Sequence, residues 1–307
     1  MEHILTALIP IFLLIITGYS FKKIDFPSSE FWKNADKLTY FVLMPALLIY
    51  KLSTANLDNI EAFDFVLTGI LALIAGLIIC IILKPTMKSS GAAFSSVVQG
   101  AIRFNTYVFL GLVSAILGDK GIAFAALFIT FAIPTINVIC ITVFAFYVND
   151  TKATFFGMIK SIIKNPLILA CLIGGFINYF DVYTPIIAVK FMEILSATAL
   201  PLGLLSIGFA LDLSSIKEAK TELVVSSILK LLVMPLVMFL IGKMFSLDPF
   251  LLTILIIFAA MPTASSSYIL ARQLGGDLKL MASIITFETL FSLFTVSFIL
   301  GLLQYLN

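Results

Sequence analysis

The sequence predicts an all-α integral membrane protein. Of its 307 residues, 61% are hydrophobic and only 12% are charged, and the mean hydropathy is +1.14. A soluble domain carries about 25% charged residues, which cover its surface in water. Here the apolar residues come in runs of about 20, the length at which a helix crosses a bilayer. Because lipid offers no hydrogen bonds to the backbone, helices are the expected elements.

Ten stretches have the length and apolar character of a membrane span. They lie near residues 3–21, 36–53, 63–83, 92–117, 121–148, 165–180, 186–211, 222–243, 249–272 and 280–305. The longest loops, near 22–35 and 149–164, are too short for a soluble domain. Most basic residues, such as Lys22, Lys84 and Lys217, fall in loops that follow odd-numbered spans. The positive-inside rule therefore places these loops in the cytoplasm and both termini outside.

The two halves of the chain repeat. The segment PIFLLIITG begins at Pro10, and PLILACLIG begins at Pro166, 156 positions later. The same offset relates LMPALLIY around Pro45 to ALPLGLLS around Pro201. In ILGDKG and QLGGDL, Gly118 aligns with Gly276 and Asp119 with Asp277, at an offset of 158. Each copy holds five predicted spans, and because five is odd the second copy is inverted in the membrane. Inverted repeats are typical of secondary transporters.

The fourth and ninth spans carry polar residues at mid-length. IRFNTYVFLG contains Arg103, Asn105 and Thr106, and the 158-residue offset pairs Asn105 with Thr263 in AAMPTASSSYI. Pro262 lacks an N–H and interrupts a helix, whereas asparagine and threonine cap helix starts. We expect each span to consist of two half-helices that meet at mid-membrane. Their free N–H groups, with Arg103 beside them, favour an anionic substrate.

Four segments resemble prokaryotic members of the auxin efflux carrier family, within the bile acid/auxin transporter-like superfamily. They are KLTYFVLMPALLIY, RFNTYVFLGL, ALPLGLLSIGFAL and PTASSSYILARQLGGD. The resemblance implies ten helices in two inverted repeats, residues 1–150 and 151–307, with broken helices four and nine crossing. It also implies a scaffold of helices 1, 2, 6 and 7, and a transport domain of helices 3–5 and 8–10. The implied activity is elevator-like transport of organic anions such as carboxylates.

The resemblance extends to individual positions. Asn105 matches the crossover asparagine of the family, and Pro262 matches the crossover proline. Phe104 stands where plant carriers have proline, and Gly111 is followed by Leu112 where several relatives have proline. The first break is therefore expected to be softer than in those relatives. The long cytoplasmic loop of plant carriers is absent from the sequence.

Two further charges lie inside predicted spans, Lys230 in the eighth and Glu288 in the tenth. Intramembrane charges are candidates for functional sites. Glu288 is expected to pair with Arg103 or Lys230; a protonatable coupling role is the less favoured alternative. Lys190 and Glu193 lie three positions apart at the outer end of span seven, where an interfacial ion pair is expected.

Other polar residues and one proline complete the candidate site. Ser265, Ser266 and Asn137 are candidate substrate ligands, and Pro134 is a candidate hinge. Serines in membrane helices also serve close helix packing, so that role stays equally open. For Asn105 the alternative is a helix cap that never touches substrate.

The leading hypothesis is a secondary transporter that exports small organic anions across the cell membrane. The sequence contains no zinc-ligand spacing, nucleophile motif or ATP-binding motif, so neither an enzyme nor a cofactor is expected, and nucleic acid is not an expected partner. The alternatives are a sodium- or proton-coupled symporter of a carboxylate or bile-acid-like anion, and a channel-like or sensory protein. Homodimerisation through the scaffold helices also stays open.

Overall fold

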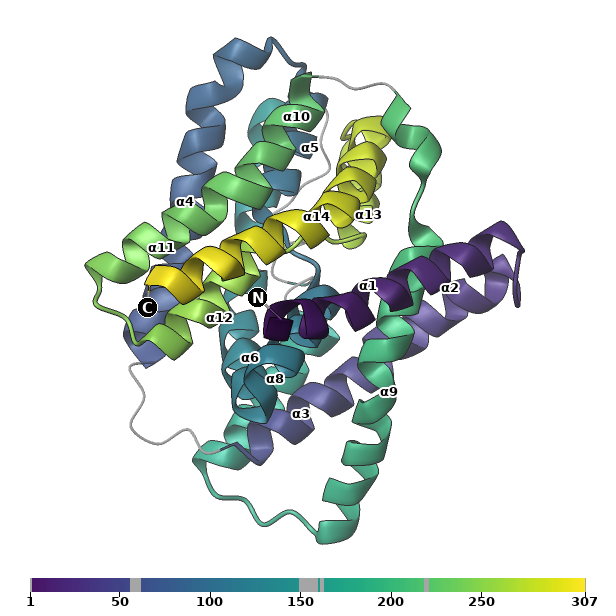
Figure 1. Ribbon diagram of the computed structural model, residues 1–307, viewed down its shortest axis with the longest axis vertical. Coiled ribbons are helices and arrows are strands. Elements are labelled where there is room, and N and C mark those ends of the chain that lie inside the picture. The colour runs from purple at the N-terminus through teal and green to yellow at the C-terminus, as the bar shows by residue number, and fades with distance from the viewer. Residues whose placement is uncertain (1, 56–61, 149–159, 161–162, 218–220, 307) are drawn as a thin grey trace.

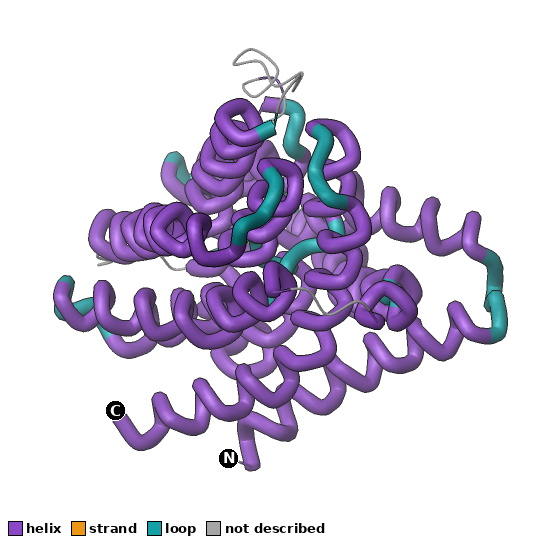
Figure 2. The backbone as a smooth tube through the Cα atoms, turned by 90° about the horizontal axis from the view of Figure 1, so that it is seen from above, coloured by secondary structure: helices purple, strands orange, loops and turns teal. Residues whose placement is uncertain are grey.

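The computed structural model describes the chain except residues 1, 56–61, 149–159, 161–162, 218–220 and 307. The described part is helical and contains no strand, which confirms the all-α prediction (Figure 2). Most of the predicted loop 149–164 lies outside the described residues. Six described stretches have the length and apolar composition to cross a membrane, including Gly91–Tyr147, and two shorter apolar helices accompany them.

The helices differ in length, from segments of five residues to α6, in which two helices follow one another across a kink. In chain order they are α1 (Glu2–Lys23), α2 (Ser29–Leu38), η1 (Thr39–Leu43), α3 (Met44–Ser53), α4 (Ala62–Met87), α5 (Gly91–Ile102), α6 (Thr106–Tyr147), α8 (Pro166–Tyr179), α9 (Ile186–Ala210), η2 (Leu213–Lys217), α10 (Thr221–Ile228), η3 (Leu229–Val233), α11 (Met234–Met244), α12 (Pro249–Ala260), α13 (Ser266–Leu274) and α14 (Leu278–Leu306) (Figure 1).

Helix α6 consists of two helices joined at Gly118. This glycine has φ 63° and ψ −157°, a conformation that only glycine adopts without strain. The kink at Gly118 falls between the predicted spans 92–117 and 121–148. Helix α6 therefore contains the end of the first of these spans and nearly all of the second.

Helix α2 corrects the sequence-based assignment, which placed residues 22–35 in a loop. The helix starts at Ser29 because the Ser28 hydroxyl accepts a hydrogen bond from the Phe31 N–H at 3.2 Å. The Trp32 ring is buried and stacks on Phe209 of α9 with centroids 5.4 Å apart. A cap and one buried aromatic residue therefore form a helix in a stretch too polar to be recognised as a span.

The helices pack in two groups (Figure 1). In one group α1 lies along α9, and α3 packs against α8 and α9; in the other, α10, α11, α12 and α14 pack together with α4. Between α1 and α9 the approach is very close, because a methyl group on Gly18 would overlap the Leu205 carbonyl. The predicted ion pair between Lys190 and Glu193 is present at 2.9 Å on the exposed side of α9.

Candidate functional site

The two predicted interruptions are present, and they touch. The first break comprises residues 103–105, between the end of α5 at Ile102 and the start of α6 at Thr106. The second comprises residues 261–265, between α12 and α13. The Asn105 N–H donates to the Pro262 carbonyl at 2.8 Å, and the Thr263 hydroxyl donates to the Gly100 carbonyl at 2.5 Å. These bonds satisfy backbone groups that the breaks leave without helical partners.

Asn105 caps the second half of its span. Its side-chain oxygen accepts hydrogen bonds from Tyr107 N at 3.1 Å and Val108 N at 3.3 Å. This is the capping role foreseen for it, since an N-cap side chain binds the first free N–H groups of a helix. Asn105 also lines a cavity, so capping and ligand binding are not exclusive.

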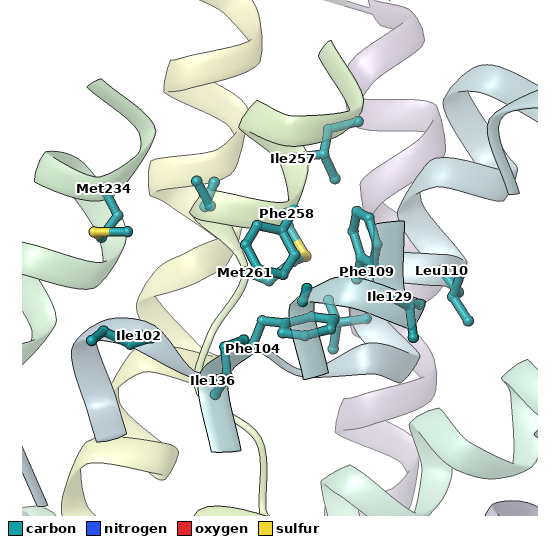
Figure 3. Close-up of a cluster of buried hydrophobic side chains, with 14 of the residues drawn as sticks. Ile102, Phe104, Phe109, Leu110, Ile129, Ile136, Met234, Ile257, Phe258 and Met261 are labelled. Carbon is teal, nitrogen blue, oxygen red and sulfur yellow. The ribbon is translucent and has the colours of Figure 1, made fainter. Parts of the chain in front are cut away.

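Phe104 stabilises the first break by aromatic packing. Its ring lies 4.4 Å from that of Phe258 in α12 and 5.6 Å from that of Phe109, measured between centroids. Figure 3 shows Phe104 pointing into this cluster beside Met261. Edge-on and tilted ring pairs add about 0.5–1.5 kcal/mol beyond their area burial. The position that holds proline in plant carriers here joins the two broken spans through apolar contact.

Arg103 lies beside the break with only neutral hydrogen-bond partners. Its guanidinium donates to Asn137 Oδ1 at 3.3 Å and to Ser266 Oγ at 3.1 Å. It makes no ion pair in the described part of the chain. Of the two partners considered for Glu288, Arg103 is not paired with it in the structure: Glu288 is fully buried and accepts from the Thr263 N–H at 3.0 Å.

A cavity of about 770 Å³ opens at the breaks and gathers much of the predicted site. The predicted residues in its lining are Arg103, Phe104, Asn105, Thr106, Asn137, Ser265 and Ser266. Three segments distant in sequence therefore converge on one cavity. Its volume is within the range of small-molecule sites.

Five predicted residues lie outside the cavity lining: Thr263, Pro262, Pro134, Glu288 and Lys230. Thr263 is fully buried, and its hydroxyl and N–H are both bonded within the protein, so it positions the second break. At Pro134, α6 continues without a non-helical residue. The hinge role of Pro134 stays a prediction.

Sequence reasoning missed one wall of the cavity. This wall comes from α2 and η1 and contains Trp32, Lys33, Asp36, Lys37 and Tyr40. Asp36 interacts with the Tyr107 side chain, which belongs to the first turn after the break. The signal available in the sequence was the Ser28 cap, followed by apolar residues spaced as on one face of a helix.

The lining favours an anion. No side chain caps α13 at Ser265, and residues 264–266 line the cavity, so the positive end of this helix faces the space beside Arg103. A guanidinium binds a carboxylate through parallel, charge-assisted hydrogen bonds. Lys33 and Lys37 add positive charge to the opposite wall, against one acidic residue, Asp36.

A cavity at the contact of two broken, apolar helices is a feature of membrane transport proteins. Comparison with known sequences agrees, since a family described as "Membrane transport protein" matches residues 151–300. A putative malonate transporter of Rhizobium meliloti is 24% identical over 99% of this chain and 97% of its own. Uncharacterized transporters of Methanocaldococcus jannaschii and Methanothermobacter thermautotrophicus are 23% and 22% identical, each over 94% of both chains. These matches are to membrane transporters rather than to enzymes, and they agree with the resemblance to the auxin efflux carrier family.

Proposed function

We propose that this protein carries small carboxylates across the cell membrane and binds their carboxylate group at Arg103. The observation that carries this proposal is a guanidinium with only neutral partners, placed in the cavity beside the uncapped start of α13. An anion there gains charge-assisted hydrogen bonds that no carboxylate among the described residues takes up. The name of the Rhizobium relative, a putative malonate transporter, supports the same substrate class.

The proposed architecture is ten spans in two inverted repeats, and matched glycine contacts support it. Gly18 of α1 packs against the backbone at Leu205 of α9, and Gly174 of α8 packs against the backbone at Ile49 of α3. Gly174 lies 156 positions after Gly18, and Leu205 lies 156 positions after Ile49, which is the offset found in the sequence. The same close helix approach therefore occurs once per repeat.

Matched hydrogen bonds at the ends of these helices support the same architecture. Lys22 Nζ donates to the Leu211 carbonyl at 2.5 Å, and Asn178 Nδ2 donates to the Ala55 carbonyl at 2.7 Å. The two donors, Lys22 and Asn178, are again 156 positions apart, and so are the two acceptors, Ala55 and Leu211. The lysine would lie at the cytoplasmic end and the asparagine at the outer end, in keeping with the positive-inside rule.

In this proposal α1, α2, α3, α8 and α9 form a scaffold, and the remaining helices form a moving transport domain. The cavity lies between them, with the wall from α2 on the scaffold side. Lys33 and Lys37 belong to a segment that the positive-inside rule predicts to be cytoplasmic, so the cavity would open inward. A negative interior supplies about 2.3 kcal/mol per charge per 100 mV to expel an anion. Efflux is therefore the proposed direction.

Exchange in proteoliposomes tests the carrier function. Vesicles loaded with unlabelled malonate are expected to accumulate labelled malonate by saturable counterflow, and empty vesicles are not. Other mono- and dicarboxylates added outside define the specificity by competition. If no carboxylate exchanges, or if the protein conducts single-channel currents instead, the carrier proposal is wrong.

Substitutions of Asn105 separate its cap from its place in the cavity. Asn105→Asp keeps the oxygen that accepts from Tyr107 N and Val108 N, but it adds a negative charge beside Arg103. We expect wild-type thermal stability and an increase of about tenfold or more in the malonate concentration for half-maximal exchange, since 1.4 kcal/mol of repulsion corresponds to tenfold. Asn105→Ala is expected to lower stability by about 1 kcal/mol through loss of the cap.

The matched control is Asp248→Asn, the reverse change at the N-cap of α12. Asp248 binds Phe250 N at 2.9 Å and does not line the cavity. Exchange by this variant is expected to equal that of the wild type. Asn105→Asp with normal exchange would contradict the placement of the anion beside Asn105.

A further inference from the structure

A second polar cluster lies behind the breaks, away from the cavity. It consists of Gln99, Ser226, Lys230, Thr263 and Glu288, and each of these side chains is fully buried. Lysine and glutamate are almost never fully buried unless they are paired. None of the five lines the 770 Å³ cavity, so the substrate site does not explain them.

The Glu288 carboxylate is well bonded, and it holds the second break. One oxygen accepts from the Thr263 N–H at 3.0 Å, and the other accepts from the Ser226 hydroxyl at 3.3 Å. The Thr263 N–H has no helical partner because it lies between α12 and α13. The position of this backbone segment therefore depends on a carboxylate in α14.

The Lys230 amine is the opposite case. It lies in the π-helical segment η3, one helical turn after Ser226, and among the described residues it has no hydrogen-bond partner. Its nitrogen lies 5.6 Å from the centre of the Phe258 ring. It forms no ion pair within 4.0 Å in the described part of the chain. The protein thus buries a basic group without giving its N–H donors an acceptor.

Lys230 and Glu288 are each other's charged neighbour. Among the described residues, no other charged group acts on either of them. The helices packed around them contribute neutral groups at this place: Gln99 and the Val97 carbonyl from α5, Ser226 from α10, and Phe258 from α12. If Lys230 and Glu288 had only a structural role, they would be expected to form a hydrogen-bonded ion pair, because direct contact best offsets the free-energy cost of removing both charges from water.

We propose that Lys230 and Glu288 form a proton site that takes up and releases one proton in each transport cycle. This inference rests on the proposed carrier function. With one proton between them the pair is neutral overall, as carboxylate and ammonium or as carboxyl and amine. With two protons it is a carboxyl and an ammonium, with a charge of +1. The second proton comes from water on one side of the membrane and leaves to water on the other.

The proton site and the anion site share one short segment. Glu288 holds the Thr263 N–H, and three residues later the Ser266 hydroxyl accepts from Arg103 at 3.1 Å. A protonated carboxyl is a weaker acceptor than a carboxylate. Proton uptake therefore loosens residues 261–265 and shifts the group that orients the anion-binding guanidinium.

Infrared spectroscopy of the purified protein in lipid tests the proton site without any substrate. The wild type is expected to show a protonated-carboxyl band that is lost as the buffer is changed from acidic to alkaline. Glu288→Gln should lack this band, whereas Glu193→Gln on the exposed side of α9 should keep it. Lys230→Met, which removes the neighbouring cation, should shift the pH at which the band is lost.

Transport driven by a pH gradient tests the coupling. With the membrane potential clamped at zero, the ratio of malonate flux with and without a pH gradient is expected to exceed one several-fold for the wild type. The ratio should fall to one in Glu288→Gln, whatever its absolute rate. A titrating band with no malonate exchange would overturn the carrier but retain the proton site. A band that does not titrate, or an E288Q variant that still responds to the gradient, would overturn the proton site itself.

Discussion

Replacing Arg103 by alanine is expected to weaken carboxylate binding by about 10- to 150-fold, the equivalent of about 1.5–3 kcal/mol for hydrogen bonds to a charged group. The protein should remain folded, because among the described residues the guanidinium bonds to neutral side chains, such as Asn137 and Ser266, and is partly exposed to the cavity. Removing it leaves no buried charge without a partner.

Binding is measured by the concentration of unlabelled malonate that halves counterflow, together with thermal stability of the purified variant. Arg272→Ala is the matched control, since Arg272 is the other arginine of the chain and lies exposed in the last turn of α13. Arg103→Lys should give intermediate affinity because lysine keeps the charge but lacks the planar donor pair. Wild-type affinity in Arg103→Ala would show that the anion binds elsewhere.

Adding one methyl group to Gly18 is expected to destabilise the protein by about 1–3 kcal/mol, the usual cost of overpacking. The Cβ of Gly18→Ala would overlap the Leu205 carbonyl, which is backbone and cannot rotate away. Gly174→Ala is expected to be destabilising as well but milder, since its Cβ would lie 2.9 Å from the Leu52 side chain and 3.1 Å from the Ile49 carbonyl. These two glycines allow the close approach of α1 to α9 and of α8 to α3.

Gly175→Ala is the control, one residue from Gly174 in the same helix. A Cβ at Gly175 would meet nothing within 4 Å. Alanine is favoured over glycine in a helix by about 1 kcal/mol, so this variant should match or exceed wild-type stability. The three variants are ranked by the temperature at which each loses its monodisperse size-exclusion peak on heating in detergent. Equal stability of Gly18→Ala and Gly175→Ala would contradict the close contact of α1 and α9.

Much of the site could be foreseen because its signals are local. Pro262 interrupts a helix through its own chemistry, and Asn105 caps one through its own side chain, so the sequence marked both breaks. The offset of 158 positions between the two halves predicted that the two breaks correspond. The hydrogen bond from the Asn105 N–H to the Pro262 carbonyl shows that they are in contact. The class of transporter followed from the segments around these residues.

The charge partners could not be foreseen, because side-chain direction at a break depends on how the broken ends pack. Depth in the membrane allowed Glu288 to pair with either Arg103 or Lys230. In the structure Arg103 bonds toward the cavity, while Glu288 bonds to Thr263 behind the break. The wall from α2 was missed for a related reason: its polar residues lie near a loop in sequence but face the cavity in space.

By itself, the sequence determined that this is a helical membrane protein with two interrupted spans and an arginine beside one interruption, and it predicted duplicated halves. These features depend on residue composition, spacing and local backbone chemistry. Only the tertiary structure decided which groups share the cavity with Arg103 and which are buried with Glu288. Membrane burial fixes how deep a residue lies, whereas the packing of neighbouring helices decides which way its side chain points.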